Sequence, residues 1–455
     1  MRLHPPILEI PEDAPYSNDL FDRKQFGDSL SSLFTTVKES MVLSVDAPWG
    51  EGKSTFARMW ISDLRRQGMN CIYFDAYEHD YSDDPFVSFC SEIISLAETA
   101  FADSDVIQVL KEDFKSKAKR IGSKLLCTGT RIGVKALTLG ILKDTDIDAL
   151  DSIRSDVANG SSNAVSLFVG KAFDDYASSK DNLVEFRNKL AALGAAVRAK
   201  QKLPLLIVVD ELDRCRPDFA LSLIERIKHL FATDDVSFVL FANMAQLENY
   251  VKMVYGAEVD ARSYLHKFFT ISTDLPQNRQ DTHENDYAKY FRRLSQHYGL
   301  DDKPGLDTIL VPLFRHYWFS LREIERCFTI LALYFAHIPS KRLPITHVIS
   351  FLAILRLKFP DVFYALAASK LSYDDLVDKT GIDRIEQTDY SRFPKDRFIC
   401  LLKFLLLTED QYNALDEKDA IHRYGQLLDG RFDMTRTKVM ALLCSDLIRF
   451  EMEEI

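Results

Sequence analysis

Features typical of several other protein classes are missing from this chain of 455 residues. Its seven cysteines are scattered and odd in number, and none forms a C-x-x-C pair. This pattern argues against a disulfide framework and favours a reduced compartment, so we expect a cytoplasmic protein. The ten histidines show no H-x-x-x-H or Cys/His spacing, which argues against a metal site of that kind. The first residues, MRLHPPILEIPEDAP, lack the apolar run of a secretory signal, and we expect none there.

An excess of positive charge is lacking as well, because 57 Lys and Arg face 68 Asp and Glu and give a net charge of −11. This balance argues against broad attraction to nucleic acid or to an anionic membrane, so nucleic-acid binding would require a local basic patch. Basic and aromatic residues mix at 287–298, but we expect a helix there with its aromatic side chains packed inward. We find no internal repeat, and the chain length favours two or three structural units.

Long uninterrupted hydrophobic runs are absent too. Residues 121–142 (IGSKLLCTGTRIGVKALTLGIL) have the length of a membrane span, but Lys124, Arg131 and Lys135 lie inside this segment. A central Lys or Arg costs roughly 2.5–3.5 kcal/mol on insertion scales, which outweighs the gain from the scattered Leu and Ile side chains. We therefore expect a buried or amphipathic surface helix here, with membrane contact as the open alternative.

What the sequence does contain is a series of short apolar runs that predict buried strands. Each run is rich in Val, Ile, Leu and Phe without strict alternation, which is typical of a parallel sheet covered on both faces. Helical patterns such as Phe86, Phe89 and Ile93 lie between them, and this succession predicts an α/β domain with right-handed crossovers. The predicted strands cover residues 41–47, 70–76, 203–212 and 236–243, and a shorter run at 268–276 is a candidate fifth.

The succession of strands and helices changes twice along the chain. Between about 103 and 200 it is replaced by charged helical segments, which we interpret as a helical insert in the α/β domain. After residue 276 only helical patterns follow. We therefore predict a lead-in segment at 1–40, an α/β domain at 41–276, and a helical lid and C-terminal domain at 277–455.

The stretch DAPWGEGKST at 46–55 follows the first predicted strand and precedes a helical pattern, which is the context of a phosphate-binding loop. Ala47 stands where the pattern G-x-x-x-x-G-K-[ST] begins with glycine, and alanine is acceptable there if its φ is negative. In such a loop Lys53 reaches the β- and γ-phosphate oxygens, and the Ser54 hydroxyl is a ligand for Mg²⁺. The predicted nucleotide-binding residues are Pro48, Trp49, Gly50, Glu51, Gly52, Lys53, Ser54 and Thr55.

A second motif ends the predicted strand at 203–212. There the apolar residues 206–209 are followed by Asp210 and Glu211. A carboxylate at the carboxyl end of a strand beside a phosphate loop holds Mg²⁺ and its waters, and we assign this role to Asp210. Glu211 is the predicted catalytic residue that orients or deprotonates the attacking water.

The arrangement of the two motifs favours ATP as the nucleotide. The strand predicted at 70–76 is an additional strand that separates the two motifs, as in ATPases whose catalytic Glu lies on an added central strand, rather than as in kinase-type or GTPase-type P-loop proteins. The guanine-reading motif N-K-x-D is absent, since Asn188 and Lys189 are followed by Leu190 and Ala191. We therefore predict a P-loop NTPase fold with ATP as substrate and Mg²⁺ as cofactor.

Together these motifs resemble the KAP family of P-loop NTPases. The resemblance covers residues 19 to about 335, with the stretch 103–200 unmatched, and the chain departs from the family pattern at Ala47, Asp75, Tyr77 and Asn243. The matching segments are AxWGEGKS in the loop, YFDAYEHD at 73–80, VVDELDRCRPDFALSLIERIKHLF at 208–231, FVLFANMAQL at 238–247, YLHKFFTISTDLP at 264–276 and SLREIERCFTIL at 320–331.

The resemblance implies roles for four further residues. Arg322 is implied to be a sensor-like arginine that reads the γ-phosphate from the helical lid, and the open alternative is a surface arginine. Asn243 takes the place of a common aspartate and is implied to supply a polar group near the γ-phosphate. Arg214 and Arg216 are candidates for arginine fingers across a subunit interface, or they brace the loop by pairing with a nearby aspartate, Asp213 or Asp218.

The resemblance also implies a biological setting. Bacterial relatives are associated with defence against phage, so we expect an ATPase component of such a system that self-associates and binds partner proteins from its operon. Two alternatives stay open at this point. One is a nucleotide-gated signalling switch with little turnover, and the other is a membrane-associated scaffold that carries an NTPase domain.

Overall fold

The computed structural model describes most of the chain outside the predicted insert. It covers residues 4–100 except 7, 38, 70, 83 and 84, most of 184–199, 204–279 except 232, 285–337, 345–386, 393–422 except 417 and 418, and 436–448. The segment 121–142 and nearly all of the insert predicted at 103–200 lie outside these residues.

Five parallel strands form one sheet, and the predicted α/β P-loop fold is confirmed. Their order in space is β2-β3-β4-β1-β5. The strand expected to separate the two motifs, β2, lies instead at an edge of the sheet, and β4 is the strand that lies between β1 and β3. The strands are β1 (Val42–Asp46), β2 (Cys71–Asp75), β3 (Leu205–Asp210), β4 (Val236–Ala242) and β5 (Ile271–Asp274).

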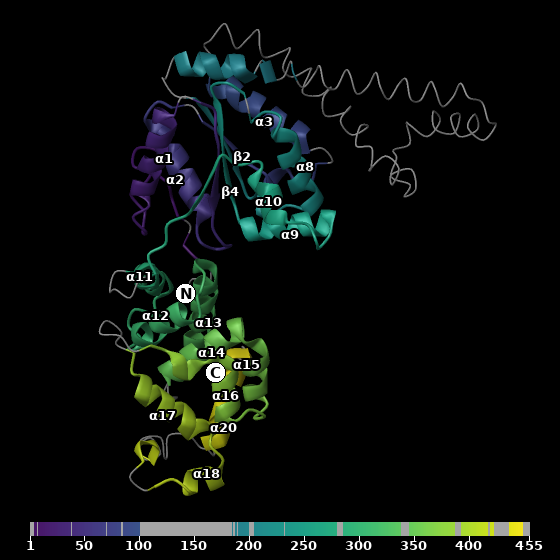
Figure 1. Ribbon diagram of the computed structural model, residues 1–455. Helices are drawn as coiled ribbons and strands as arrows, with labels where there is room; N and C mark the ends of the chain where they lie inside the picture. The colour runs from purple at the N-terminus through teal and green to yellow at the C-terminus, as the bar shows by residue number, and fades with distance from the viewer. Residues whose placement is uncertain are drawn as a thin grey trace, which may run out of the picture.

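Helices cover both faces of the sheet, which explains why the strands read as continuous apolar runs. Every residue of β3 and β4 is buried. On one face α1 and α2 pack over a core that contains Trp60 and Phe241, and on the other α3, α8 and α9 enclose Phe89 and Phe238 (Figure 1). The helices of this domain are α1 (Lys24–Thr36), α2 (Lys53–Arg66), α3 (Pro85–Ala100), α8 (Pro217–Ile227), α9 (Met244–Tyr255) and α10 (Ala261–His266), with short 3-10 turns η1 (Tyr77–His79) and η2 (Leu212–Arg214).

Beyond β5 the described residues form helices and no further strand. These helices enclose a core of their own, in which Ile324, Phe328 and Leu331 are buried, as their spacing predicted. α14 is buried on all sides and forms the centre of this bundle. The elements are α11 (Asp286–Tyr298), α12 (Leu306–His316), α13 (Leu321–His337), α14 (Thr346–Lys358), α15 (Pro360–Ala367), α16 (Tyr373–Thr380), η3 (Ile382–Arg384), α17 (Lys395–Leu406), α18 (Glu409–Asn413) and α20 (Arg436–Ile448).

The two domains meet where the carboxyl edge of the sheet faces α11 and α13 (Figure 1). The N-terminal end of the chain also lies beside these helices, where the main-chain oxygen of His4 is 2.9 Å from Nε2 of His297. The phosphate loop is therefore bordered by the N-terminal segment as well as by the helical domain. Within the part of the chain that the structure describes, no helix is both long and apolar enough to cross a membrane.

Candidate functional site

The phosphate loop connects the buried strand β1 to α2. Gly50 and Gly52 have φ values of 81° and 80°, a region that side-chain-bearing residues rarely adopt. Ala47 is not among the described residues with positive φ, and its side chain is buried in the core beneath α2. The Ala47 main-chain oxygen accepts a hydrogen bond of 2.6 Å from Nζ of Lys53. What position 47 contributes is therefore a carbonyl group, which alanine supplies as well as glycine does.

Asp213 ties the loop to the segment that follows β3. Its Oδ2 accepts a hydrogen bond of 2.6 Å from the indole Nε1 of Trp49 and lies 3.5 Å from Nζ of Lys53. Asp213 is 1% exposed, and its Oδ1 has no hydrogen-bond partner within the described residues. The Tyr250 hydroxyl donates to the main-chain oxygen of Asp213 at 2.8 Å. The sequence indicated Asp213 only as a possible partner of Arg214 or Arg216, and its contacts with Trp49 and Lys53 were not expected.

Asp210 ends β3 as a fully buried carboxylate. Its oxygens accept hydrogen bonds from the Tyr73 hydroxyl at 2.9 Å and from the Glu211 main-chain nitrogen at 2.8 Å. Burial, with the neighbouring Glu211 charge as a second cause, raises the pKa of Asp210 to about 7. The structure therefore keeps a carboxylate here at a cost in electrostatic free energy, which is common at functional sites.

Glu211 lies beside the first residues of α2. It has a φ of 59° and is mostly buried. Its Oε1 accepts a hydrogen bond from the Ser54 hydroxyl, and its Oε2 forms an ion pair of 2.5 Å with Nε of Arg214. A left-handed conformation in a residue with a side chain is a local strain that the surroundings must hold in place. The structure thus brings Lys53, Ser54, Asp210 and Glu211 together at the carboxyl ends of β1 and β3.

The oxygens at this edge fit a magnesium ion. Ser54 and Asp210 offer a hydroxyl and a carboxylate, which are hard ligands of the kind that Mg²⁺ prefers, and both contact Glu211. The described residues contain no group of three or more His, Cys, Asp or Glu side chains that could hold a metal ion. Because Mg²⁺ usually binds through one or two protein oxygens together with substrate phosphates and waters, this sparse set suits it better than a complete cage would.

The two candidate arginine fingers have partners that the sequence did not indicate. Arg214 pairs with Glu211, and Nε of Arg216 lies 3.0 Å from Oδ1 of Asp80. Asp213 is bound by Trp49 and Lys53 instead of by either arginine. A pairing with Asp218 and a role across a subunit interface both stay predictions. Arg214 lies within the site of its own chain, whereas Arg216 is fixed to the segment after β2.

Asn243 follows β4 and begins α9. Its side-chain oxygen accepts a hydrogen bond of 3.3 Å from the Gln246 main-chain nitrogen and so caps this helix. The next nitrogen, that of Met244, donates to Oδ1 of Asp46 at 2.9 Å, which ties the end of β4 to the end of β1. Asn243 thus stands at the same edge as the other site residues. A role of its amide group toward phosphate stays a prediction.

A model of the KAP family P-loop domain matches residues 23–336 of this sequence. The chain belongs to the KAP family. Curated proteins give no match. Among solved structures, the ORC2 protein of Aeropyrum pernix (described as ADPNP-ADP complexes) is similar, with 12% sequence identity and a TM-score of 0.34. The match covers 98% of this chain and 95% of the ORC2 chain. Membership of the KAP family implies nucleotide binding and hydrolysis, and the matched region extends from the N-terminal segment through α13.

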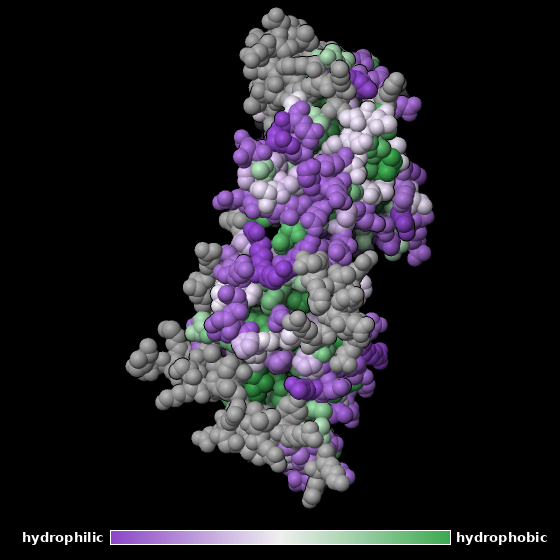
Figure 2. All heavy atoms as spheres, turned by 90° about the vertical axis from the view of Figure 1, so that its left-hand side faces the viewer, coloured by the Kyte–Doolittle hydropathy of each residue, from purple (hydrophilic) through white to green (hydrophobic). Residues whose placement is uncertain are grey.

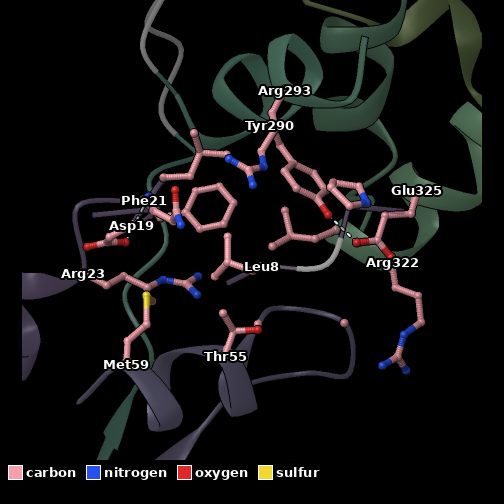
Figure 3. A pocket seen from close by; sticks show the side chains of 16 residues that line it. Leu8, Asp19, Phe21, Arg23, Thr55, Met59, Tyr290, Arg293, Arg322 and Glu325 are labelled. Carbon is pink, nitrogen blue, oxygen red and sulfur yellow. Dashed lines mark hydrogen bonds between the residues drawn. The ribbon is translucent and has the colours of Figure 1, made fainter. Parts of the chain in front are cut away.

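In this KAP domain the first turn of α13 packs directly on the phosphate loop. A Cβ atom added to Gly50 would lie 2.8 Å from Cβ of Arg322, so a glycine is required there by both its φ and its neighbour. The Arg322 side chain is exposed, extends beside the loop, and has no ion-pair partner among the described residues (Figure 3). An unpaired guanidinium at this position is available to an anion bound in the loop.

A cavity of about 240 Å³ adjoins the loop between the N-terminal segment, α2, α11 and α13. The rings of Phe21 and Tyr290 lie 5.9 Å apart on its walls, and the Tyr290 hydroxyl donates to Glu325 (Figure 3). The face of the molecule on this side is mostly hydrophilic where the two domains meet, with a small hydrophobic patch (Figure 2). The lining residues are Pro6, Leu8, Asn18, Asp19, Leu20, Phe21, Arg23, Gly50, Gly52, Thr55, Met59, Tyr290, Arg293, Leu321, Arg322 and Glu325.

Replacing Ala47 with glycine should change nucleotide affinity by no more than about fivefold, since glycine adds only about 0.5–1 kcal/mol of backbone entropy and keeps the carbonyl group. Gly50→Ala should weaken binding at least tenfold, because a positive φ costs an alanine roughly 1–2 kcal/mol and its Cβ would press on Arg322. Titration with a fluorescent ATP analogue measures both. A large gain in affinity for Ala47→Gly would mean that alanine impairs this loop.

Replacing Asp210 with asparagine should stabilise the ligand-free protein above neutral pH. The folded pKa of about 7 exceeds the ordinary value of 3.8, so the charged carboxylate lowers the free energy of unfolding as pH rises through this window. The gain should be near zero at pH 4 and reach roughly 2–4 kcal/mol at pH 8. Thermal denaturation in a chelating buffer checks this, and a stability difference independent of pH would contradict it.

Proposed function

We propose that this KAP protein binds ATP and hydrolyses it with Mg²⁺. The observation that carries the proposal is the convergence of Lys53, Ser54, Asp210 and Glu211 at one edge of the sheet, through the contacts of Ser54 with Glu211 and of Asp210 with the Glu211 main chain. A lysine, a hydroxyl and two carboxylates are the groups that phosphate transfer to water requires. The fold holds each of them on a buried strand or at a helix start.

Each side chain has a task that its position supports. Main-chain N–H groups at the start of α2 and the Lys53 ammonium bind the phosphates. Ser54 and Asp210 would hold Mg²⁺, which supplies charge neutralisation at the phosphate oxygens when it is bound. Glu211 accepts a proton from the attacking water, once its Oε1 is released by the Ser54 hydroxyl. Arg322 donates to the terminal phosphate from the lid.

The cavity beside the loop suits the nucleoside part of ATP. It begins at Thr55 in the first turn of α2, and the aromatic rings of Phe21 and Tyr290 on its walls offer apolar faces to a purine base. The sequence holds no guanine-reading N-K-x-D motif, which favours adenine. Competition of GTP against bound ATP measures this preference, and equal or tighter GTP binding would contradict it.

A second function is favoured by the state of Glu211. Both of its carboxylate oxygens are engaged, one by Ser54 and one by Arg214. A base held in this way supports a slow, nucleotide-gated switch that keeps ATP bound and signals through assembly. The copurification of nucleotide with a very low turnover would distinguish this switch from a fast ATPase.

The cellular setting is proposed from the family resemblance and from the scattered cysteines. We infer a cytoplasmic component of an anti-phage defence system that self-associates and binds partners from its operon. A membrane-associated scaffold is the alternative, and segment 121–142, on which it depends, lies outside the described residues. Pull-down of the natively expressed protein, with its partners and its membrane fractionation determined, tests this setting.

Lys53→Ala should lose ATP binding, whereas Glu211→Gln should bind ATP and hydrolyse it about 10²–10⁴-fold more slowly. Lys53 neutralises phosphate in the ground state, so its loss removes binding energy before any chemistry. Glutamine keeps the size of Glu211 but lacks the basic oxygen, so the cost falls on the transition state. Turnover, ATP affinity and sedimentation of both variants measure the difference.

Two exposed residues serve as matched controls for these variants. Lys370→Ala and Glu258→Gln make the same chemical changes at exposed positions outside the site, after α15 and after α9, and should behave as wild type. Wild-type turnover in Glu211→Gln would remove Glu211 from the mechanism. Unaltered ATP affinity in Lys53→Ala would contradict the assignment of the phosphate loop.

Arg322→Ala should slow hydrolysis at least about tenfold and leave ADP affinity nearly unchanged, because in the proposed mechanism the guanidinium contacts only the terminal phosphate. Arg326→Ala removes an exposed arginine one turn further along α13 and should have neither effect. Single-turnover hydrolysis and ADP titration give the two quantities. Equal losses of ADP and ATP affinity with unchanged turnover would make Arg322 a structural residue.

A further inference from the structure

Glu51 lies in the phosphate loop, and its side chain pairs with a residue outside the loop. It is 4% exposed, and its Oε1 accepts a hydrogen bond of 2.6 Å from Nη2 of Arg279. Arg279 belongs to the linker that joins β5 to α11. The pair therefore connects the phosphate loop to the start of the helical domain.

Arg279 is held by the helical domain at the same time. Its guanidinium lies 5.5 Å from the ring of Tyr287 on α11 and 5.7 Å from the ring of Trp318 in the turn before α13. Trp318 adopts a φ of 50° and stands four residues before Arg322. One cation thus contacts the loop and two segments of the lid, the second of which leads into Arg322.

Arg23, in the N-terminal segment, binds both the phosphate loop and the linker. Nη1 of Arg23 donates to the Glu51 main-chain oxygen at 3.0 Å, and its Nε donates to the Pro276 main-chain oxygen at 3.2 Å. Arg23 is 4% exposed. The loop and the linker are therefore bound to each other twice, directly through Arg279 and indirectly through Arg23.

The linker itself is fixed to α11. Asp286 accepts a hydrogen bond of 2.7 Å from the Asn278 main-chain nitrogen and returns one of 2.8 Å from its own nitrogen to the Asn278 oxygen. Arg279 follows this closed pair directly. These two hydrogen bonds hold the residue before Arg279 against the start of α11. Through Arg279, the position of Glu51 is therefore connected to the position of α11.

We propose that the Glu51–Arg279 ion pair is the positioning contact that seats the lid on the phosphate loop and so places Arg322 for hydrolysis. The proposal rests on the proposed ATPase function and assigns to Glu51 a task other than contact with nucleotide. Both groups are largely buried, and removing one partner of a buried pair leaves the other charge uncompensated. The pair acts through the position of the lid, and neither residue touches the reacting atoms.

The test compares Arg279→Met and Glu51→Gln with the wild type. Methionine keeps an apolar side chain of similar length near the two aromatic rings, and glutamine keeps the size of Glu51, so each removes mainly the charge. Both variants should lower kcat roughly ten- to a hundredfold, as expected for a misplaced catalytic group, while the ATP KM changes less than about threefold. Arg322→Ala should cost nothing further in the Arg279→Met background, since the two changes remove the same interaction.

A control variant and a second readout separate this proposal from general destabilisation. Arg66→Met breaks an arginine–carboxylate pair of similar length within one helix, in which Nη2 of Arg66 lies 2.8 Å from Oδ1 of the buried Asp63 in α2, and should leave kcat unchanged. Hydrogen exchange with a non-hydrolysable ATP analogue should show protection of α11 and α13 in the wild type and in Arg66→Met. In Arg279→Met and Glu51→Gln the analogue should protect the loop alone.

The possible outcomes test the proposed ATPase function and the proposed role of the Glu51–Arg279 pair separately. A wild type that neither binds nor hydrolyses ATP would overturn the proposed function. A wild type that is active, with full turnover and lid protection in both variants, would overturn the role of the pair and leave the ATPase assignment standing. If Arg279→Met fails to fold, Glu51→Gln decides the question by the same measurements.

Discussion

Lys53 is a buried cation beside the carboxylates that follow β3, and its Nζ lies 3.5 Å from Oδ2 of Asp213. Asp210, Glu211 and Asp213 are each less than 9% exposed and stand within four consecutive residues. Buried charges of one sign are stable only when hydrogen bonds and counter-charges surround them, which explains the contacts of Tyr73, Trp49, Ser54 and Arg214 with this group. These contacts join β2, the phosphate loop and β3 into one unit. A bound complex of Mg²⁺ and nucleotide would bring a positive charge to these carboxylates and negative phosphate charges to Lys53.

The same loop carries the connection between the two domains. Its main chain faces the phosphate site, Gly50 leaves room for the first turn of α13, and Glu51 reaches the linker through Arg279. Gly50 and Glu51 are neighbours in this loop, and both contact the helical domain or the linker that leads to it. In this account nucleotide binding and lid position are coupled because they use neighbouring residues of one loop.

The parts of this structure that were predictable depend on local patterns. The apolar runs and the motif spacings predicted the five parallel strands, the phosphate loop and the carboxylates after β3. The contacts that complete the site were not predictable, since they join residues 137 positions apart for Tyr73 and Asp210, and 228 positions apart for Glu51 and Arg279. The cavity walls at Phe21 and Tyr290 escaped prediction for the same reason, because only the packing of the N-terminal segment against α11 brings them together.

Determination of the structure of Glu211→Gln with ATP and Mg²⁺ tests this account most directly. We expect the phosphates on the main chain between Gly50 and Ser54 with Lys53 beside them, the metal ion at Ser54 and Asp210, and the base in the cavity whose walls include Phe21 and Tyr290. The ion pair of Glu51 with Arg279 should persist, and Arg322 should contact the terminal phosphate. A nucleotide bound elsewhere, or a base outside this cavity with the lid detached from the loop, would contradict the account.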